Sequence, residues 1–304
     1  MKPELLSLTR VWDEAPHSAF TDLLRHGGRW WCTFREALDH GPSLGTLRVL
    51  SSEDGAGWTR VAEVAEPGVD LRDPKLSVRP DGRMVLLTCA CVYDEENNYL
   101  TRSPRVCFSD DGVSWTAPAR FLAEDHWLWR VTWHGEVGYG VSKLGEGSYP
   151  RRGFLYRTRD GLEWEWLTEF FLPRETWTAS ETTVRILDDE RMVALVRPNW
   201  IGVSSPPYRE FEWTELEERM GGPNFLVLPG GRMWACARGR HLDGGAATVL
   251  SRMTETEYEP VMRLPSGGDC SYPGMVWHEG LLWMSYYSSH EGKACIYLAK
   301  LRLP

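Results

Sequence analysis

One pattern of apolar and polar residues recurs along the whole chain. Each copy is an apolar stretch, a short turn rich in Gly and Asp, and a second apolar stretch. The six copies span residues 20–34, 74–88, 130–141, 182–196, 224–237 and 273–286. Turns such as PDG and PGG join antiparallel strands, because Gly and Asp tolerate the tight backbone of a hairpin. The pattern therefore predicts six β-hairpins, spaced about 40 to 57 residues apart.

The spacing of the hairpins leaves room for two further strands in each unit. Four-stranded units that repeat with this period are typical of β-propellers, in which blades surround a central channel. The last unit has room for only three strands, 273–277, 281–287 and 294–302, and the N-terminal segment 5–12 can supply the fourth. We therefore predict an all-β fold over residues 1–304. It is a single six-bladed β-propeller with four-stranded antiparallel blades, and the N-terminal strand closes the ring.

A second element follows the hairpin in three of the units. Segments 51–58, 108–115 and 157–164 each carry an acidic residue, a Gly and a Trp at the same offsets. These segments resemble the Asp-box repeat of the sialidase superfamily, Ser-x-Asp-x-Gly-x-Thr-Trp, with Glu53 and Arg159 in the place of its Asp. The resemblance implies a structural β-turn in which a carboxylate accepts backbone N–H groups, Gly takes a positive φ and Trp packs into the blade.

The composition of the chain indicates which classes of partner and which cellular compartment to expect. The 304 residues carry a net charge of −9 and no apolar run long enough to span a bilayer, so we expect neither a nucleic acid nor a membrane as partner. The N-terminal MKPELLSLTR lacks the apolar core of a secretory signal. The seven cysteines are odd in number and lie mostly in strand-like runs, which predicts buried free thiols and a cytoplasmic location.

The propeller geometry predicts which charged residues meet. In such a blade the innermost strand starts at the mouth of the channel at which the second strand ends. The starts of the first strands supply Asp22, Arg72, Asp73, Arg130, Glu181, Asn224, Asp269 and Tyr272. The ends of the second strands, or residues near them, supply Arg35, Glu36, His40, Lys143, Arg197, Arg238 and His290. Several guanidinium groups around one axis repel one another unless an anion or intervening carboxylates balance them, so we expect a pocket for an anionic ligand.

Three segments that contribute to this mouth resemble catalytic segments of the sialidase superfamily. ETTVRILDDERMVALVR (181–197) is similar to the segment in which a Glu opens one strand and an Arg closes the next. NFLVLPGGRMWACAR (224–238) repeats that pattern. SYPGMVWHEGLLWMSYY (271–287) resembles the segment of the final blade that carries the nucleophilic Tyr.

The resemblance implies roles for four of these residues. Tyr272 would be the nucleophile, Glu181 would accept its proton, and Arg197 and Arg238 would bind the substrate carboxylate. A Tyr nucleophile suits a sugar with a carboxylate beside the anomeric carbon, because a carboxylate nucleophile would be repelled. The implied activity is that of a retaining exo-glycosidase acting on a terminal acidic sugar.

The general acid and the other substrate contacts are chosen from the same mouth. A neighbouring Asp would protonate the leaving oxygen, and our choice is Asp73, followed by Glu36 and Asp22. The remaining residues that we expect to contact the substrate are Arg35, Glu36, His40, Arg72, Arg130 and His290.

This chain departs from the family pattern at two points. The Arg-Ile-Pro segment of the family's first blade corresponds here to FTDL (20–23), which has no Arg, so Arg72 or Arg35 would replace the missing ligand. Tyr272 precedes a Pro where the family more often has Ser. The sugar therefore stays open among sialic acid, another ulosonic acid and a uronic acid.

Two other classes of function fit the same residues. One is a propeller polysaccharide lyase on uronates, with Tyr or His as base and Arg neutralising the carboxylate. The other is a non-catalytic carbohydrate-binding propeller, in which Tyr272 merely lines the channel and Glu181 forms a structural ion pair with Arg197. The histidines show no metal-ligand spacing and no Gly-rich phosphate loop is present, so we predict no metal and no organic cofactor. The oligomeric state is not indicated.

Overall fold

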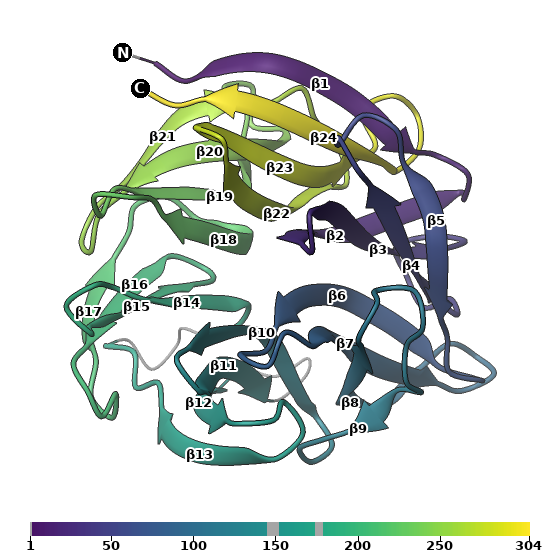
Figure 1. Ribbon diagram of the computed structural model, residues 1–304, viewed down its shortest axis with the longest axis horizontal. Coiled ribbons are helices and arrows are strands. Elements are labelled where there is room, and N and C mark those ends of the chain that lie inside the picture. The colour runs from purple at the N-terminus through teal and green to yellow at the C-terminus, as the bar shows by residue number, and fades with distance from the viewer. Residues whose placement is uncertain (1, 145–151, 174–178) are drawn as a thin grey trace.

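The computed structural model describes residues 2–144, 152–173 and 179–304 of the chain. Within these ranges the chain forms 24 strands in six four-stranded sheets, which are arranged as blades around one axis (Figure 1). Neighbouring strands of each sheet are antiparallel, as the hairpin pattern predicts. None of the described elements is a helix that could cross a membrane.

Blades 1 to 3 are each built from four consecutive strands. Blade 1 consists of β2 (His17–His26), β3 (Arg29–Ala37), β4 (Thr46–Ser52) and β5 (Thr59–Val64). Blade 2 consists of β6 (Asp70–Val78), β7 (Met84–Tyr93), β8 (Tyr99–Ser109) and β9 (Ala119–Arg120). Blade 3 consists of β10 (His126–His134), β11 (Val137–Leu144), β12 (Arg152–Thr158) and β13 (Trp164–Glu169).

Blades 4 and 5 follow the same order, and blade 6 does not. Blade 4 consists of β14 (Thr182–Ile186), β15 (Met192–Val196), β16 (Trp200–Ser204) and β17 (Glu212–Glu215). Blade 5 consists of β18 (Gly221–Val227), β19 (Met233–Arg240), β20 (Ala246–Met253) and β21 (Tyr258–Arg263). Blade 6 consists of β22 (Cys270–His278), β23 (Leu281–Ser288), β24 (Cys295–Arg302) and the N-terminal strand β1 (Glu4–Trp12).

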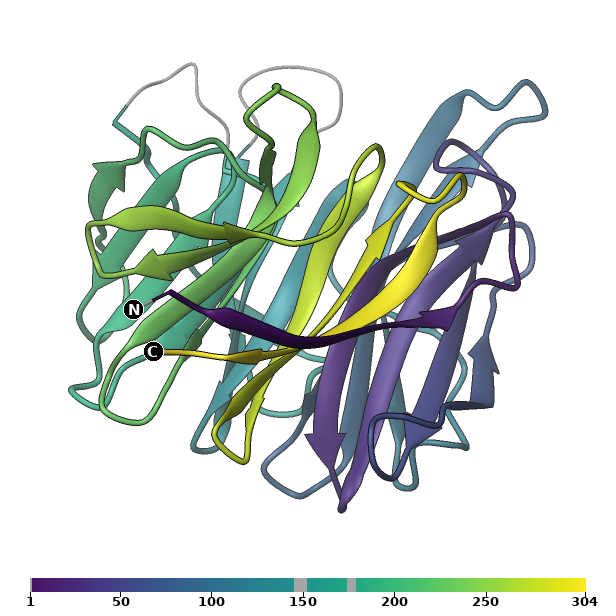
Figure 2. The ribbon, with the colours of Figure 1, turned by 90° about the horizontal axis from the view of Figure 1, so that it is seen from above.

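The ring is closed by strands from the two ends of the chain. β1 pairs antiparallel with β24 from Glu4 opposite Arg302 to Trp12 opposite Ile296, and the two ends lie side by side (Figure 2). This pairing confirms the predicted six-bladed propeller closed by the N-terminal strand. It also satisfies the backbone groups along the edge of β24, which would otherwise be free to pair with another chain.

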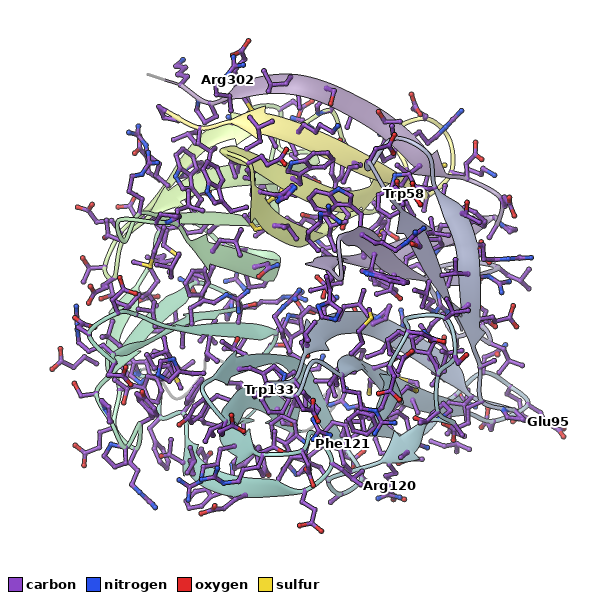
Figure 3. All side chains as sticks on the ribbon, in the orientation of Figure 1. Trp58, Glu95, Arg120, Phe121, Trp133 and Arg302 are labelled. Atoms are coloured by element: carbon purple, nitrogen blue, oxygen red, sulfur yellow. The ribbon has the colours of Figure 1, made fainter. Side chains whose placement is uncertain are left out.

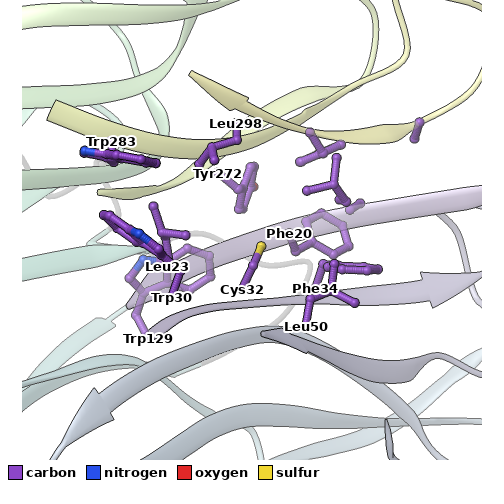
Figure 4. Close-up of a cluster of buried hydrophobic side chains, with 14 residues drawn as sticks. Phe20, Leu23, Trp30, Cys32, Phe34, Leu50, Trp129, Tyr272, Trp283 and Leu298 are labelled. Atoms are coloured by element: carbon purple, nitrogen blue, oxygen red, sulfur yellow. The ribbon is translucent and has the colours of Figure 1, made fainter. Parts of the chain in front are cut away.

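The apolar side chains of the hairpins pack between the blades. One cluster joins blades 1 and 6, where Trp30 stacks on Trp283 with ring centroids 4.2 Å apart (Figure 4). Charged side chains such as Glu95, Arg120 and Arg302 lie at the outer rim (Figure 3). All seven cysteines are buried and free, which confirms the thiol prediction.

Three similar turns connect the third and fourth strands of blades 1 to 3. In each turn one carboxylate accepts two backbone N–H groups, as expected for this element, with the second turn holding Val113 and Ser114 at 2.8 and 2.7 Å. The carboxylates belong to Asp54, Asp111 and Asp160. Each of these Asp residues directly precedes the Gly of its turn. The predicted alignment with the repeat, which places Glu53 and Arg159 at the acidic position, is therefore wrong by one residue.

The Gly of the turn also receives the neighbouring blade. A Cβ built on Gly112, which has a φ of 73°, would lie 2.3 Å from the Trp31 ring of blade 1. Only a residue without a side chain permits this contact between blades.

Candidate functional site

The six innermost strands, β2, β6, β10, β14, β18 and β22, surround the axis, and each contacts the next (Figure 1). Five of them have an irregular register near their start, and a residue with a positive φ lies at the irregularity in β2, β6, β18 and β22. These residues are Phe20 (φ 61°), Asp73 (φ 51°), Gly222 (φ 57°) and Tyr272 (φ 52°). Such β-bulges redirect side chains, and left-handed backbone at a non-Gly residue costs of order 1–3 kcal/mol and is found mainly at functional sites.

Tyr272 forms a hydrogen-bonded group with residues from blade 4. Its hydroxyl donates to Oε1 of Glu181 at 2.9 Å, and Nη1 of Arg197 donates to the same carboxylate oxygen at 2.7 Å and to the phenol oxygen at 3.3 Å. Glu181 directly precedes β14 and Arg197 directly follows β15, so the hairpin holds both residues at one mouth. The predicted proximity of these three residues is present in the structure.

The environment separates the protonation states of the phenol and the carboxylate. Burial acts to raise the pKa of Glu181, but the charges of Arg197 and Lys143 outweigh it and lower that pKa to about 2. Burial and the charge of Glu181 both raise the pKa of Tyr272 well above its usual range. At neutral pH the pair therefore consists of an ionised carboxylate and a phenol that donates its proton to it.

The walls around the Tyr272 ring are formed by backbone and by aromatic rings. The N–H of Gly222 donates to Oε2 of Glu181 at 2.7 Å, and a Cβ on Gly222 would lie 2.7 Å from the Tyr272 ring. Phe20 and Trp129 pack edgewise on Tyr272 with centroid distances of 5.3 and 5.7 Å (Figure 4). The ring is therefore fixed by close packing on several sides.

Arg238 adds a second guanidinium beside the phenol. Its Cζ lies 5.5 Å from the centroid of the Tyr272 ring, and its Nη1 lies 3.9 Å from Oδ1 of Asp269. The side chains of Arg197 and Arg238 remain about one third and one quarter exposed, at 32% and 27%. Both can therefore reach an anion that enters from solvent.

Asp73 is buried close to this group. Burial raises its pKa, although Lys75 and Arg72 act in the opposite direction, and the charge of Glu181 raises it further. Its Oδ1 is buried without a hydrogen-bond partner among the described residues. A carboxyl group with a raised pKa and a free oxygen suits a proton donor.

Two lysines also lie at this site: Lys143, which the sequence places at the same mouth without a role, and Lys75, which the sequence pattern did not indicate. The charge of Lys143 acts on both Glu181 and Asp73, and its Nζ lies 4.1 Å from the Trp127 ring centroid. Burial lowers the pKa of Lys75 to about 8, against the charges of Asp73 and Asp22. Lys75 follows Asp73-Pro74 at the start of β6, and this Pro marks the bulge that places it.

Asp269 gathers two histidines that are far away in the sequence. Its Oδ2 contacts Nε2 of His17 at 2.9 Å and Nδ1 of His40 at 2.7 Å, while Oδ1 accepts the hydroxyl of Tyr287 at 2.7 Å. The three potential ligand atoms of His17, His40 and Asp269 lie within 4.8 Å of one another, so a metal ion could be held there. The sequence missed this cluster because spacing along the chain cannot show it.

Arg35 and Glu36 do not face the site, which corrects the expectation that they bind substrate. Arg35 is fully buried, and its guanidinium donates to Oδ1 of Asp70 at 2.7 Å and to carbonyl oxygens of the loop 39–43. Glu36 is buried and accepts hydrogen bonds from Trp12 and Arg48. Arg35 therefore links blade 1 to β6 of blade 2, and Glu36 links it to β1 of blade 6.

Arg130 and Asp22 bind each other inside the channel. This corrects the expectations that Arg130 contacts the substrate and that Asp22 is an alternative general acid. Nη1 and Nη2 of Arg130 donate to the two carboxylate oxygens of Asp22 at 2.9 and 3.0 Å, which links blade 3 to blade 1. Asp22 has no exposed surface and also accepts the N–H of Leu76 at 2.8 Å. This pairing leaves neither residue available to a substrate.

The other two residues that we expected to contact the substrate, Arg72 and His290, lie in different places. Arg72 lies beside the group, with its Cζ 5.2 Å from the Phe20 ring centroid and its Nη2 donating to the carbonyl of His40 at 2.8 Å. No described contact joins it to Arg197 or Arg238. His290 instead contacts Ser288 at 2.9 Å in the loop after β23, and its ring packs on the third strand of the blade.

No protein-family model matches this chain, and no curated protein is detectably similar to it in sequence. Among solved structures, it is similar to a protein of unknown function from Dyadobacter fermentans, with a TM-score of 0.86 and 18% identity over the whole of both chains. It is also similar to an alpha-L-arabinofuranosidase from Fusarium graminearum, with a TM-score of 0.74 and 13% identity over 98% of both chains.

A third similar structure is the Trypanosoma rangeli sialidase, with a TM-score of 0.73 and 11% identity over 94% of this chain. This chain spans about half of that enzyme, since the match covers 55% of it. At these identities the likeness concerns the fold, which resembles the propellers of glycoside hydrolases.

Proposed function

We propose that the protein is a retaining exo-glycosidase that hydrolyses a terminal acidic sugar, such as a sialic, another ulosonic or a uronic acid. The observation that carries the proposal is the hydrogen bond of 2.9 Å between the buried phenol of Tyr272 and the ionised carboxylate of Glu181. A nucleophile with its base already in contact is the arrangement that covalent catalysis needs. The fold shared with a sialidase and an arabinofuranosidase supports a glycosidase.

In the first step the phenol oxygen of Tyr272 attacks the anomeric carbon. Its proton moves to Glu181, the bond from the anomeric carbon to the leaving oxygen breaks, and Asp73 gives its proton to that oxygen. In the second step the ionised Asp73 takes a proton from water, the water oxygen attacks the anomeric carbon, and the bond between that carbon and the Tyr272 oxygen breaks. The released phenolate recovers its proton from Glu181. Two displacements at one carbon retain the anomeric configuration.

Substrate binding would also adjust the base. The substrate carboxylate pairs with Arg197 and Arg238, which remain partly exposed beside the ring. Arg197 is the strongest of the charges that lower the pKa of Glu181 to about 2. A carboxylate that neutralises Arg197 therefore raises that pKa, and Glu181 becomes a better proton acceptor only when an acidic sugar is bound.

The test is a screen of purified protein against aryl glycosides of sialic, other ulosonic and uronic acids. We expect turnover of at least one acidic glycoside, and a fluorinated analogue of it should give a covalent adduct on Tyr272, detected by peptide mass spectrometry. Tyr272→Phe and Glu181→Gln should abolish turnover while ligand binding persists. Tyr286→Phe is the matched control, because it removes another buried phenol from blade 6 that bonds to the carbonyl of Pro265 instead.

Two results would overturn the proposal in favour of the alternatives. An unsaturated product that absorbs in the ultraviolet would indicate a lyase. Tight binding of an acidic sugar without turnover, unchanged in Tyr272→Phe, would indicate a binding module.

A further inference from the structure

A pocket rich in arginine borders the Tyr272 site on the side of blades 4 and 5. Its volume is about 290 Å³, and ten described residues line it. Four of the ten are arginines, Arg197, Arg219, Arg238 and Arg240, and none of the ten is acidic. We call it the arginine pocket.

The local charge of this pocket is opposite to that of the protein. The chain as a whole carries a net charge of −9, yet four guanidinium groups gather around one small cavity. The side chain of Arg197 is balanced by Glu181, at 2.7 Å, on the side that faces Tyr272. Arg240 donates to a backbone carbonyl, that of Gly244, at 3.1 Å, and this contact brings no negative charge. Such clusters are stabilised when an oxyanion binds between the guanidinium groups.

Two of the four arginines connect the pocket to the reaction site. Arg197 donates to the phenol oxygen of Tyr272, and Arg238 lies against its ring. Gly221 leaves room for the guanidinium of Arg238, since a Cβ built on Gly221 would lie 3.1 Å from its Nη2. Arg219 and Arg240 are exposed and line the pocket without a described contact to Tyr272.

We propose that the arginine pocket binds a second oxyanion of the substrate, a sulfate, phosphate or carboxylate carried by the group next to the terminal sugar. The inference rests on the proposed function and narrows its substrate class to saccharides with two adjacent acidic groups. One anion meets Arg197 and Arg238 beside Tyr272, and the second reaches Arg219 and Arg240.

The first test measures binding without turnover. Inorganic sulfate is titrated calorimetrically into wild-type protein, into R219Q/R240Q and into R252Q, with sodium chloride holding the ionic strength constant. Arg252 is a suitable control because it is an exposed arginine of the same blade, paired with Glu259 at 3.1 Å. We expect R219Q/R240Q to bind sulfate at least about tenfold more weakly, the loss typical of charge-assisted hydrogen bonds, and R252Q to bind as wild type does. Equal affinity in all three proteins would overturn the proposal.

The second test measures substrate preference. The same terminal acidic sugar is offered with a neutral aryl leaving group and with a sulfated sugar as leaving group. We expect the ratio of the two kcat/KM values, sulfated over neutral, to fall about tenfold in R219Q/R240Q and to stay at the wild-type value in R252Q. An unchanged ratio with weakened sulfate binding would show that the pocket holds a free oxyanion and would overturn the substrate assignment.

The two proposals fail in different ways. Sulfate binding that depends on Arg219 and Arg240, in a protein that turns over no glycoside, sinks the proposed function and supports an oxyanion site. Glycoside turnover by a protein that binds no sulfate sinks only the arginine pocket.

Discussion

Removing Arg197 would leave the carboxylate of Glu181 buried without its strongest opposite charge. The interactions around Glu181 lower its pKa from 4.5 to about 2, which corresponds to about 3 kcal/mol in favour of the ionised form. Arg197 supplies the largest of these interactions and Lys143 the next. We therefore expect a coupling energy of about 2 to 3 kcal/mol between Arg197 and Glu181.

A double-mutant cycle measures this coupling. Urea unfolding of wild type, R197Q, E181Q and R197Q/E181Q at pH 7 gives the four free energies of unfolding. R197Q alone should lose about 3 kcal/mol or more, because it leaves an unpaired buried charge, and E181Q should restore part of that loss. Because the folded-state pKa of Glu181 lies below its unfolded value, its stabilisation is present above pH 4.5 and is lost as the pH falls toward 2. The coupling should shrink over that range.

The matched control is the exposed pair Arg157–Glu165 on β12 and β13, with N–O distances of 2.8 and 2.9 Å. Exposed pairs contribute at most about 1 kcal/mol despite good geometry. A coupling between Arg197 and Glu181 no larger than that of the control would refute the reasoning, because the burial and charge that we assign to Glu181 would then have no energetic effect.

Three other substitutions test the surrounding structure by urea unfolding. Gly222→Ala should lower the free energy of unfolding by at least about 1 kcal/mol more than Gly230→Ala does, and it should also lower kcat. Both positions have a positive φ, but only position 222 places a methyl group against the Tyr272 ring. Equal losses of stability in the two variants would contradict this. Burial lowers the pKa of Lys75 from 10.5 to about 8. The free energy of unfolding of wild type should therefore rise by up to about 3 kcal/mol relative to that of Lys75→Met as the pH increases from 8 to 10.5. A difference between the two proteins that does not change with pH would speak against this. Asp22→Asn leaves a buried guanidinium without its partner and should cost about 3 to 5 kcal/mol at pH 7, whereas a loss under 1 kcal/mol would argue that the channel ion pair contributes little.

The sequence was sufficient for the ring and for one part of the site. Repeated hairpins fix the start and end of each inner strand, and the circular arrangement then brings Glu181, Arg197 and Tyr272 together although they come from blades 4 and 6. Their proximity follows from strand geometry, while the catalytic roles stay predictions until they are tested.

The hairpin pattern could not predict in which direction each side chain points across the channel. Arg35 lies near the end of β3 and Arg130 lies within β10, at positions that the hairpin pattern treats like that of Arg197, yet buried acidic residues bind both of them. Whether an arginine meets a substrate or a carboxylate depends on distances between blades that no local pattern contains. One sequence signal for the bulges was available, because Pro follows the left-handed residue at Asp73 and Tyr272, and Pro within a strand marks a bulge.

The pairing of β1 with β24 sets the order in which the molecule can be completed during synthesis. β1 leaves the ribosome well before its partner β24, which is made only after the strands of the other five blades. Until then its backbone lacks a sheet, and blade 6 has no fourth strand. The proposed reaction site takes Tyr272 from that same blade, so under the proposed function we expect no activity from nascent chains that are stalled before β24 has emerged.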